Sequence, residues 1–321
     1  MLLVTGGTGF IGGHLLERLS NSGTSAKCLL RRTSASRRLP AGMEPVIADL
    51  KSGDGLADAL DGVDTVIHLA GMTKALRPQD YFAGNAQTTR TLAEALARRA
   101  IRLIHVSTLA AIGPGTDARP VTEDAEPHPL TSYGKSKLEA ERIVRACLPQ
   151  AVILRPAVVY GPRDTDVFQI LRSVAKGLMV QIAGPERWFS AIYVADLIDA
   201  LLAAACSRGA AGREYFLAHP QPVSWTGLGL AAGRIMGRTP RVVRVPSTLA
   251  TMFGYCGEIR SRIRRKPGII SREKVREARC ANWTCDTSRA EQELGFRART
   301  SLEEGLGRTL AWYKDAGWLN Y

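Results

Sequence analysis

The sequence predicts an α/β protein: a doubly wound parallel sheet with helices on both faces, followed by a smaller, mostly helical C-terminal lobe. Three observations support this fold class. Short apolar runs rich in β-branched residues alternate with segments of helical periodicity through the first half of the chain. A glycine-rich turn follows the first of these runs directly. After residue 163 the alternation loosens and helical patterns dominate.

The glycine-rich turn occupies residues 6–12, which read GGTGFIG, between an apolar strand and a helix. A strand, a turn of this kind and a helix in that order form the first unit of a dinucleotide-binding Rossmann domain. We expect Gly7 to allow the tight turn, Gly9 to admit the pyrophosphate and Gly12 to let helix and strand pack closely. The N–H groups at the start of the helix would then hold the phosphates.

The second predicted strand, residues 25–30, ends in Arg31 and Arg32. A domain that prefers NAD usually has an acidic residue here, which accepts from the ribose 2′-hydroxyl. An arginine pair instead suits a 2′-phosphate, so we expect NADP to be preferred over NAD. The alternative is that both arginines are solvated, as the nearby Arg37 and Arg38 also suggest.

Residues suited to ligand contact follow the next two strands. Asp49 lies just past the third strand, where it would accept from the adenine amino group or cap the next helix. The fourth strand begins at Asp64 and ends in Ala70 and Gly71, whose small side chains leave room for a ligand. His68, inside this apolar run, is expected to be packed rather than catalytic.

The remaining pattern divides the chain into two units. We expect residues 1–163 to form the Rossmann domain, with 187–217 returning to it, and 164–186 and 218–321 to form the substrate lobe. Beyond the fourth strand, the sequence predicts helices over 81–100, 131–144 and 167–176 and an alanine-rich helix that ends at Cys206. It predicts strands over 101–106, 151–154 and 213–217, and Arg155-Pro156 is expected to end the strand over 151–154.

Thr108, Tyr133 and Lys137 carry the predicted chemistry. Thr108 follows the fifth strand, and Tyr133 and Lys137 are four residues apart in the next helix, so they share one face. The ordinary pKa of a phenol is about 10, and we expect the lysine cation to lower it by stabilising the phenolate. Tyr133 would exchange a proton with a substrate oxygen as hydride moves to or from nicotinamide, and Thr108 would hold that oxygen.

Composition limits the other function classes. The chain has 321 residues, of which 45% are hydrophobic and 23% charged, and a net charge of +13. No basic patch is interleaved with aromatic residues, so nucleic acid is disfavoured as a partner. We also expect no membrane span, no signal peptide, reduced thiols without a metal site, and a cytoplasmic location.

These motifs together resemble the extended short-chain dehydrogenases/reductases, within the NAD-dependent epimerase/dehydratase group. The matching motifs are TGxxGxxG at 5–12, the serine/threonine motif at 106–108 with Gly113, YxxxK at 133–137, RP…YGP at 155–162 and VxD at 194–196. One departure is NAQTTRTL at 85–92, where the family has NxxGTxNL.

The resemblance implies a role for each matching residue. It makes Tyr133 the acid/base, Lys137 the residue that tunes its pKa and binds ribose, and Thr108 the donor to the substrate oxygen. It also implies Asp49 near adenine and Asn85 on the cofactor side of the site. The full set expected to bind the cofactor is Gly6, Gly7, Thr8, Gly9, Phe10, Ile11, Gly12, Arg31, Arg32, Asp49, Leu50, Leu69, Ala70, Gly71, Asn85, Tyr133, Lys137 and Pro156.

Several substrates fit this set of residues. We favour an oxidoreductase acting on a secondary alcohol or ketone of an apolar alicyclic or steroid-like molecule, because residues 214–225 and 244–246 are similar to the 3β-hydroxysteroid dehydrogenase-like branch. Nucleotide-sugar members often carry Arg five residues before the Val of VxD, where this chain has Phe189, with Arg187 out of register. The alternatives are a nucleotide-sugar epimerase, dehydratase or reductase, and a non-catalytic cofactor-binding regulator.

Residues 247–266 combine an apolar helical face with a run of arginines. This segment is either an ordinary amphipathic helix of the lobe or a lid over an apolar substrate that touches an acidic membrane surface. The resemblance also implies a homodimer, which pairs through the helix that holds Tyr133 and the helix before it.

Overall fold

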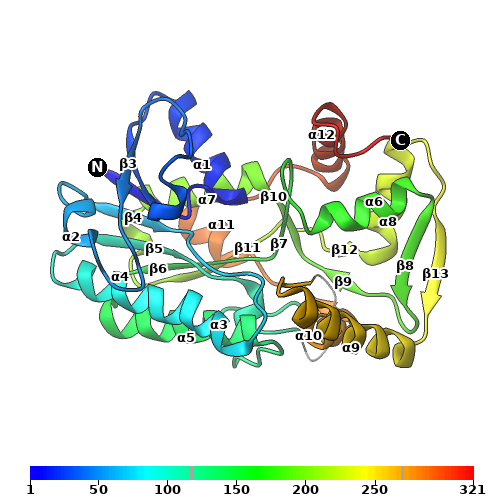
Figure 1. Ribbon diagram of the computed structural model, residues 1–321. Coiled ribbons are helices and arrows are strands. Elements are labelled where there is room, and N and C mark those ends of the chain that lie inside the picture. The colour runs from blue at the N-terminus through cyan, green and yellow to red at the C-terminus, as the bar shows by residue number, and fades with distance from the viewer. Residues whose placement is uncertain (116–118, 269–270) are drawn as a thin grey trace.

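The computed structural model describes residues 1–115, 119–268 and 271–321. A seven-stranded sheet in the order β11-β6-β5-β4-β1-β2-β3 lies at its centre, with helices on both faces (Figure 1). Every strand pair in this sheet is parallel. The strands are β1 (Leu2–Thr5), β2 (Ala26–Leu30), β3 (Met43–Ile47), β4 (Thr65–His68), β5 (Arg102–Val106), β6 (Val152–Pro156) and β11 (Glu214–Leu217). The predicted doubly wound α/β fold is confirmed.

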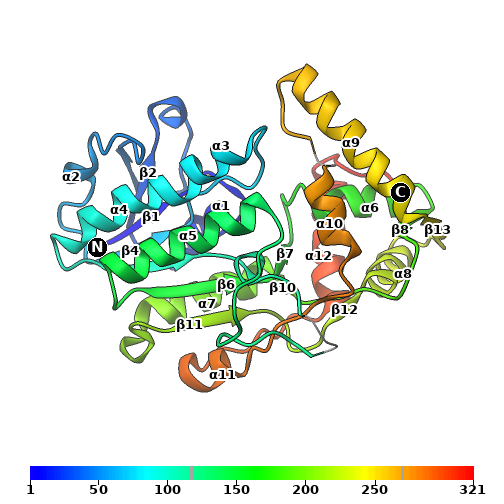
Figure 2. The same cartoon turned by 90° about the horizontal axis from the view of Figure 1, so that it is seen from below.

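Two apolar cores hold the helices on the sheet, because alternate residues of each strand point to opposite faces. Val4 of β1 belongs to one core and Leu3 to the other. The first core lies under α1 (Phe10–Asn21), α7 (Val194–Cys206) and α11 (Ser288–Leu294), and the second under α2 (Leu56–Ala59), α4 (Thr88–Ala97) and α5 (Ser132–Cys147). Figure 2 shows α4 and α5 side by side across the sheet.

The helix expected over 81–100 is divided into three parts. It consists of α3 (Pro78–Phe82), the π-helical segment η2 (Ala83–Gln87) and α4. A π-helical turn widens the helix locally and is often found at functional sites. Here it holds the buried side chain of Asn85, which bonds to the backbone of Met72 after β4.

The sixth strand also differs from the prediction. It continues through Arg155 and Pro156, which was expected to end it, and Pro156 pairs with Leu217. The chain leaves the main sheet one residue later, at Ala157, before β7 (Val158–Tyr160) pairs with β10 (Ala191–Tyr193). A proline is tolerated here because it only removes one donor at the end of the strand.

A second unit lies beside the carboxyl ends of the strands (Figures 1 and 2). Its own core includes Leu171, Leu228, Leu310 and Tyr313. It contains α6 (Val167–Ala175), β8 (Leu178–Ile182), β9 (Trp188–Phe189), β12 (Val223–Ser224), α8 (Trp225–Ile235), β13 (Arg241–Val245), α9 (Ser247–Arg264), α10 (Arg272–Arg279), β14 (Asn282–Trp283) and α12 (Leu302–Asp315). This agrees with the predicted smaller, mostly helical C-terminal lobe.

One segment inside the predicted lobe packs elsewhere. Helix α11 contacts β11 and α7, and its Ala290 is part of a core of the main sheet. The division into domains at the stated residues therefore stays a prediction. All six cysteines carry free thiols. None of the described helices is long and apolar enough to cross a membrane.

Candidate active site

The glycine-rich turn joins β1 to α1, but two of its glycines act differently from the prediction. Gly6, not Gly7, has the left-handed backbone, with φ +73°, and a Cβ there would lie 2.6 Å from the backbone N of Ala70. A Cβ on Gly7 would lie 2.5 Å from Sγ of Cys28, so Gly7 is needed for packing against β2. Gly6 therefore provides the tight turn.

The start of α1 fits the pyrophosphate of a dinucleotide. The N-cap residue, Gly9, has no side chain to occupy the free N–H groups of the first helical turn. A Cβ on Gly9 would meet only the carbonyl oxygen of Gly6, at 3.2 Å, so its outer side is open. Gly12 is the close-packing position as predicted, since its Cβ would lie 2.2 Å from the same oxygen. Thr8 is exposed beside this turn, and Phe10 and Ile11 are partly buried.

Arg31 and Arg32 lie directly after β2, and both side chains are exposed. Asp49 is also exposed, and its carboxylate accepts a hydrogen bond from the backbone N–H of Lys51 at 2.8 Å. Asp49 thus caps a turn rather than the next helix. Leu50 is buried in the core beneath this turn, so only its backbone is available to a ligand.

The loop after β4 is tied to α5 by Asn85. Its amide donates to the carbonyl of Met72 at 3.0 Å and to the hydroxyl of Ser136 at 2.9 Å, and its oxygen accepts from the N–H of Met72 at 2.6 Å. The same oxygen would lie 3.0 Å from a Cβ on Gly71. Asn85 therefore shapes the loop of Leu69, Ala70 and Gly71, where a cofactor was predicted to lie.

Tyr133 lies in the first turn of α5 and is partly buried. Burial raises its pKa to about 12, while a hydrogen bond with the side chain of Thr108 acts in the opposite direction. We expected Lys137 to lower this pKa. Instead, the Lys137 ammonium donates to the carbonyl of Val106 at 2.8 Å, and burial lowers its own pKa to about 8. In this structure Tyr133 is thus a neutral phenol at neutral pH.

Thr108 and Pro156 lie at the carboxyl ends of two neighbouring strands, β5 and β6. Thr108 follows β5 and caps the 3₁₀ turn η3 (Leu109–Ala111), its hydroxyl accepting from the N–H of Ala110 at 3.2 Å. Pro156 ends β6, the next strand of the sheet. Carboxyl ends of parallel strands gather at the edge of the sheet where ligands bind.

A buried ion-pair network lies behind Lys137 and was not predicted. Glu141 is fully buried one helical turn after Lys137 and accepts two hydrogen bonds from Arg155, at 3.1 and 2.7 Å. It also accepts one from Ser107, next to Thr108, at 2.5 Å. The spacing of four residues from Lys137 is a signal that could have placed Glu141 on the same face of the helix.

The second unpredicted contribution comes from α10. Glu273 accepts hydrogen bonds from the backbone N–H and the hydroxyl of Ser132, and Glu277 accepts one from Thr131 at 3.3 Å. Negative charge at a helix N-terminus is stabilising, so α10 holds the first turn of α5, where Tyr133 lies. No local pattern indicates this contact, because its partners lie 141 and 146 residues apart in the chain.

The geometry can be compared with known proteins. A family model described as the NAD dependent epimerase/dehydratase family matches residues 2–218, which include the glycine-rich turn, Thr108, Tyr133 and Lys137. This chain belongs to that family. It is an extended short-chain dehydrogenase/reductase, and its class of activity is that of an NAD(P)-dependent oxidoreductase or epimerase.

Members with several activities are similar to this chain over nearly their whole length. The ceramide reductase of Caulobacter vibrioides is 30% identical, over 99% of this chain and 96% of that protein. The decarboxylating sterol-4-alpha-carboxylate 3-dehydrogenase of Saccharomyces cerevisiae is 25% identical over 98% of each chain. Among solved structures, MoeE5 in complex with UDP-glucose and NAD is 26% identical, with a TM-score of 0.77 over 98% of this chain and 99% of that one.

Proposed function

We propose that this family member is an NADP-preferring oxidoreductase that interconverts a ketone and a secondary alcohol on an apolar, lipid-like substrate. The observation that carries the proposal is the placement of the Tyr133 phenol close to the Thr108 side chain, whose influence lowers the pKa of Tyr133 against the effect of burial, beside a glycine-rich turn suited to a dinucleotide. A hydroxyl and a phenol that meet at the ligand edge of the sheet form a site for one substrate oxygen.

In the direction of reduction, the chain supplies the proton. When bound, the nicotinamide supplies the hydride to the carbonyl carbon. Tyr133, a neutral phenol because burial raises its pKa to about 12, donates its proton to the carbonyl oxygen as that oxygen gains charge. The Thr108 hydroxyl donates a hydrogen bond to the same oxygen. The products are an alcohol and a phenolate that regains its proton from water.

The preference for NADP rests on Arg31 and Arg32. Both follow β2 and are exposed, and neither forms an ion pair within the described residues. A guanidinium presents donors in a fork that matches phosphate oxygens, whereas a 2′-hydroxyl would lack its usual carboxylate acceptor here. The pair therefore supports recognition of a 2′-phosphate.

The apolar substrate is supported by two side chains in the lobe. Phe189, which stands where nucleotide-sugar enzymes often have Arg, is buried in the core of the lobe against Trp225. Arg187 donates to carbonyls of its own loop, at 2.7 Å to Ile182 and 3.2 Å to Pro185. Neither side chain is therefore suited to grip the pyrophosphate of a nucleotide sugar. The similarity to a ceramide reductase and a sterol dehydrogenase favours lipid substrates.

A second candidate is a nucleotide-sugar epimerase, dehydratase or reductase that uses Thr108, Tyr133 and Lys137 in the same way. The similarity to MoeE5, whose structure holds UDP-glucose and NAD, favours it. An epimerase returns its cofactor to the starting state in each cycle, so it produces no net change in nicotinamide absorbance.

The two candidates are separated by one set of assays. The chain is titrated with NADPH and NADH, then incubated with oxidised or reduced cofactor and a panel of sterols, long-chain keto lipids and nucleotide sugars. Net change in nicotinamide absorbance with a lipid of matching product mass supports the proposal. Sugar conversion without net absorbance change supports the epimerase. Tight cofactor binding without any turnover would favour a non-catalytic regulator.

We also propose that the chain is a homodimer, paired through α4 and α5. A surface recess lies between these helices and the end of α3, lined by Phe82, Ala83, Ala86, Gln87, Arg90, Glu139 and Ile143. Phe82 is an exposed aromatic side chain at this surface. Sedimentation velocity on Phe82→Ser tests the pairing, which predicts a shift from dimer towards monomer.

A further inference from the structure

Helix α9 carries a continuous apolar stripe on its exposed side. Leu249, Met252, Phe253, Cys256, Ile259 and Ile263 recur at intervals of three and four residues, so they lie on one face. Exposed fractions of 53% for Met252, 57% for Ile259 and 78% for Ile263 are high for large apolar side chains. Exposed apolar surface of this extent marks an interaction site.

The opposite side of α9 packs against the protein and fixes the orientation of the stripe. Ala250 is buried, and a Cβ on Gly254 would lie 3.2 Å from the backbone of Arg272 in α10. Glu258 accepts from Arg272 at 2.8 Å, and the Arg272 guanidinium lies 4.7 Å from the ring of Tyr255. The stripe therefore faces away from α10, as the position of α9 on the outside of the lobe also indicates (Figure 2).

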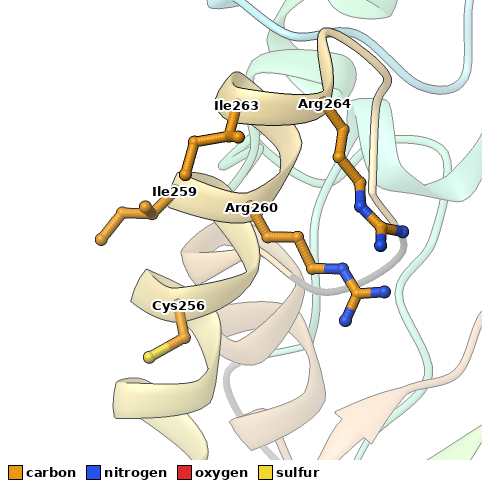
Figure 3. Close-up of a pocket in the computed structure, with 5 residues that line it drawn as sticks. All are labelled: Cys256, Ile259, Arg260, Ile263 and Arg264. Carbon is orange, nitrogen blue, oxygen red and sulfur yellow. The ribbon is translucent and has the colours of Figure 1, made fainter.

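Cations flank the stripe at the C-terminal end of α9. Figure 3 shows Cys256, Ile259 and Ile263 projecting from one side of α9, and Arg260 and Arg264 extending from the other. Together these five residues line a shallow surface recess. Three further cations lie in the same stretch of chain, Arg262, Arg265 and Lys266. The sequence of α9 contains one acidic residue, Glu258, and its carboxylate already forms an ion pair with Arg272 of α10. The charge of this end is thus uncompensated.

We infer that α9 docks onto an anionic lipid membrane, with its apolar stripe inserted among the acyl chains and its arginines bound to lipid phosphates. An apolar face bordered by cations is the pattern of a helix that lies in the membrane interface. A nucleic acid would match the charge but offers no apolar surface for Ile259 and Ile263. A second copy would bring the same cations to the interface, because a two-fold interface pairs a surface with itself.

Docking through α9 also positions the active site. Helix α10 packs on α9, and its Glu273 bonds to Ser132, the residue before Tyr133. The membrane surface would therefore lie next to the element that holds the first turn of α5. This inference deepens the proposed function, because a water-insoluble substrate would reach the site from that membrane.

Vesicle flotation of the full chain tests the inference without turnover, so its failure is separate from failure of the proposed activity. The vesicles contain phosphatidylcholine alone or mixed with phosphatidylglycerol. We expect binding to the anionic vesicles, weakened by salt. Arg260→Gln with Arg264→Gln should weaken it by roughly 30-fold, since each arginine near such a surface contributes about fivefold. Ile259→Ser with Ile263→Ser should weaken it at least as much.

Matched variants come from α8 of the same lobe and, for Arg238, from the turn that follows it, and far-UV circular dichroism verifies that every variant is folded. Arg234→Gln with Arg238→Gln removes the same charge, and Leu230→Ser with Ile235→Ser removes exposed apolar side chains of 45% and 38% exposure. Both should bind vesicles like the unchanged chain. Equal binding to neutral and anionic vesicles would overturn the inference, and so would an equal loss of vesicle binding in the control variants. A change of oligomeric state in Ile259→Ser with Ile263→Ser would also overturn it, because a second copy would then cover the stripe.

Discussion

The carboxylate of Glu273 accepts hydrogen bonds from both the backbone N–H and the hydroxyl of Ser132, at 3.1 and 2.7 Å. Ser132 opens α5, so a residue of the C-terminal lobe completes the helix that carries Tyr133. Helices α10 and α5 therefore hold together the turn that carries the proposed acid/base. A charged acceptor at this position satisfies N-terminal groups of the helix and matches its dipole.

Replacing Glu273 by Gln should slow turnover without changing cofactor affinity. The amide offers a weaker acceptor to Ser132, so Tyr133 loses alignment with the substrate, and we expect kcat to fall about 10-fold. Glu258→Gln is the matched control, because it loosens α10 from α9 but not from α5. Equal kcat values for the two variants would remove the positioning role of Glu273.

Tyr133→Phe should abolish proton transfer while leaving the dinucleotide site intact. General acid catalysis contributes about 100-fold or more, so kcat should fall by at least that factor. NADPH titration by fluorescence should give the same Kd as the unchanged chain. Tyr81→Phe is the control, since its ring centroid lies 6.1 Å from that of Tyr133. Substantial activity in Tyr133→Phe would exclude the phenol as the acid.

The pH dependence of cofactor capture should follow Lys137. Burial lowers its pKa to about 8, so its positive charge is present below that pH and lost above it. If the ammonium binds the cofactor ribose, kcat/KM for NADPH is constant at low pH and falls above about pH 8. Tyr133 stays protonated throughout this range. Lys137→Arg, which remains charged, should extend the plateau to about pH 10, and an unchanged profile would contradict the assignment.

Replacing Arg31 and Arg32 together by Ala should shift cofactor preference towards NAD. The loss of charge-assisted contacts to a 2′-phosphate should weaken NADPH binding by at least roughly 10-fold and leave NADH binding nearly unchanged. The same substitutions at Arg37 and Arg38 remove equal charge from the same loop. If both pairs lower the NADPH/NADH affinity ratio equally, a diffuse basic surface, not an arginine fork, is responsible.

Gly12→Ala should damage both stability and cofactor binding. The added Cβ would lie 2.2 Å from the carbonyl oxygen of Gly6, so α1 must move away from the turn. We expect the free energy of unfolding to fall by about 1–3 kcal/mol and NADPH affinity to fall with it. Gly307→Ala in α12 is the control, since its Cβ would meet nothing within 4 Å. Urea unfolding should detect a neutral or slightly stabilising effect there.

Local patterns in the sequence predict the fold class and the candidate site residues. The apolar run before residues 6–12 and the helix after them predict the dinucleotide-binding unit, and four-residue spacing puts Tyr133 and Lys137 on one face. The sequence did not predict that Gly6, rather than Gly7, provides the tight turn, because sequence spacing does not say which of two adjacent glycines has positive φ. The raised pKa of Tyr133 escaped it too, because burial depends on the packed structure.

The sequence by itself determined most of the alternating strands and helices of the first half of the chain, the glycine-rich turn, and Thr108, Tyr133 and Lys137 as candidates, because each depends on residues close together in the chain. Only the tertiary structure decided that Glu273 reaches Ser132 across 141 positions and that Glu141 meets Arg155 behind the site. It also decided which face of α9 is left exposed, since α10 covers the other. These relationships arise from the packing of distant segments, which no local periodicity encodes.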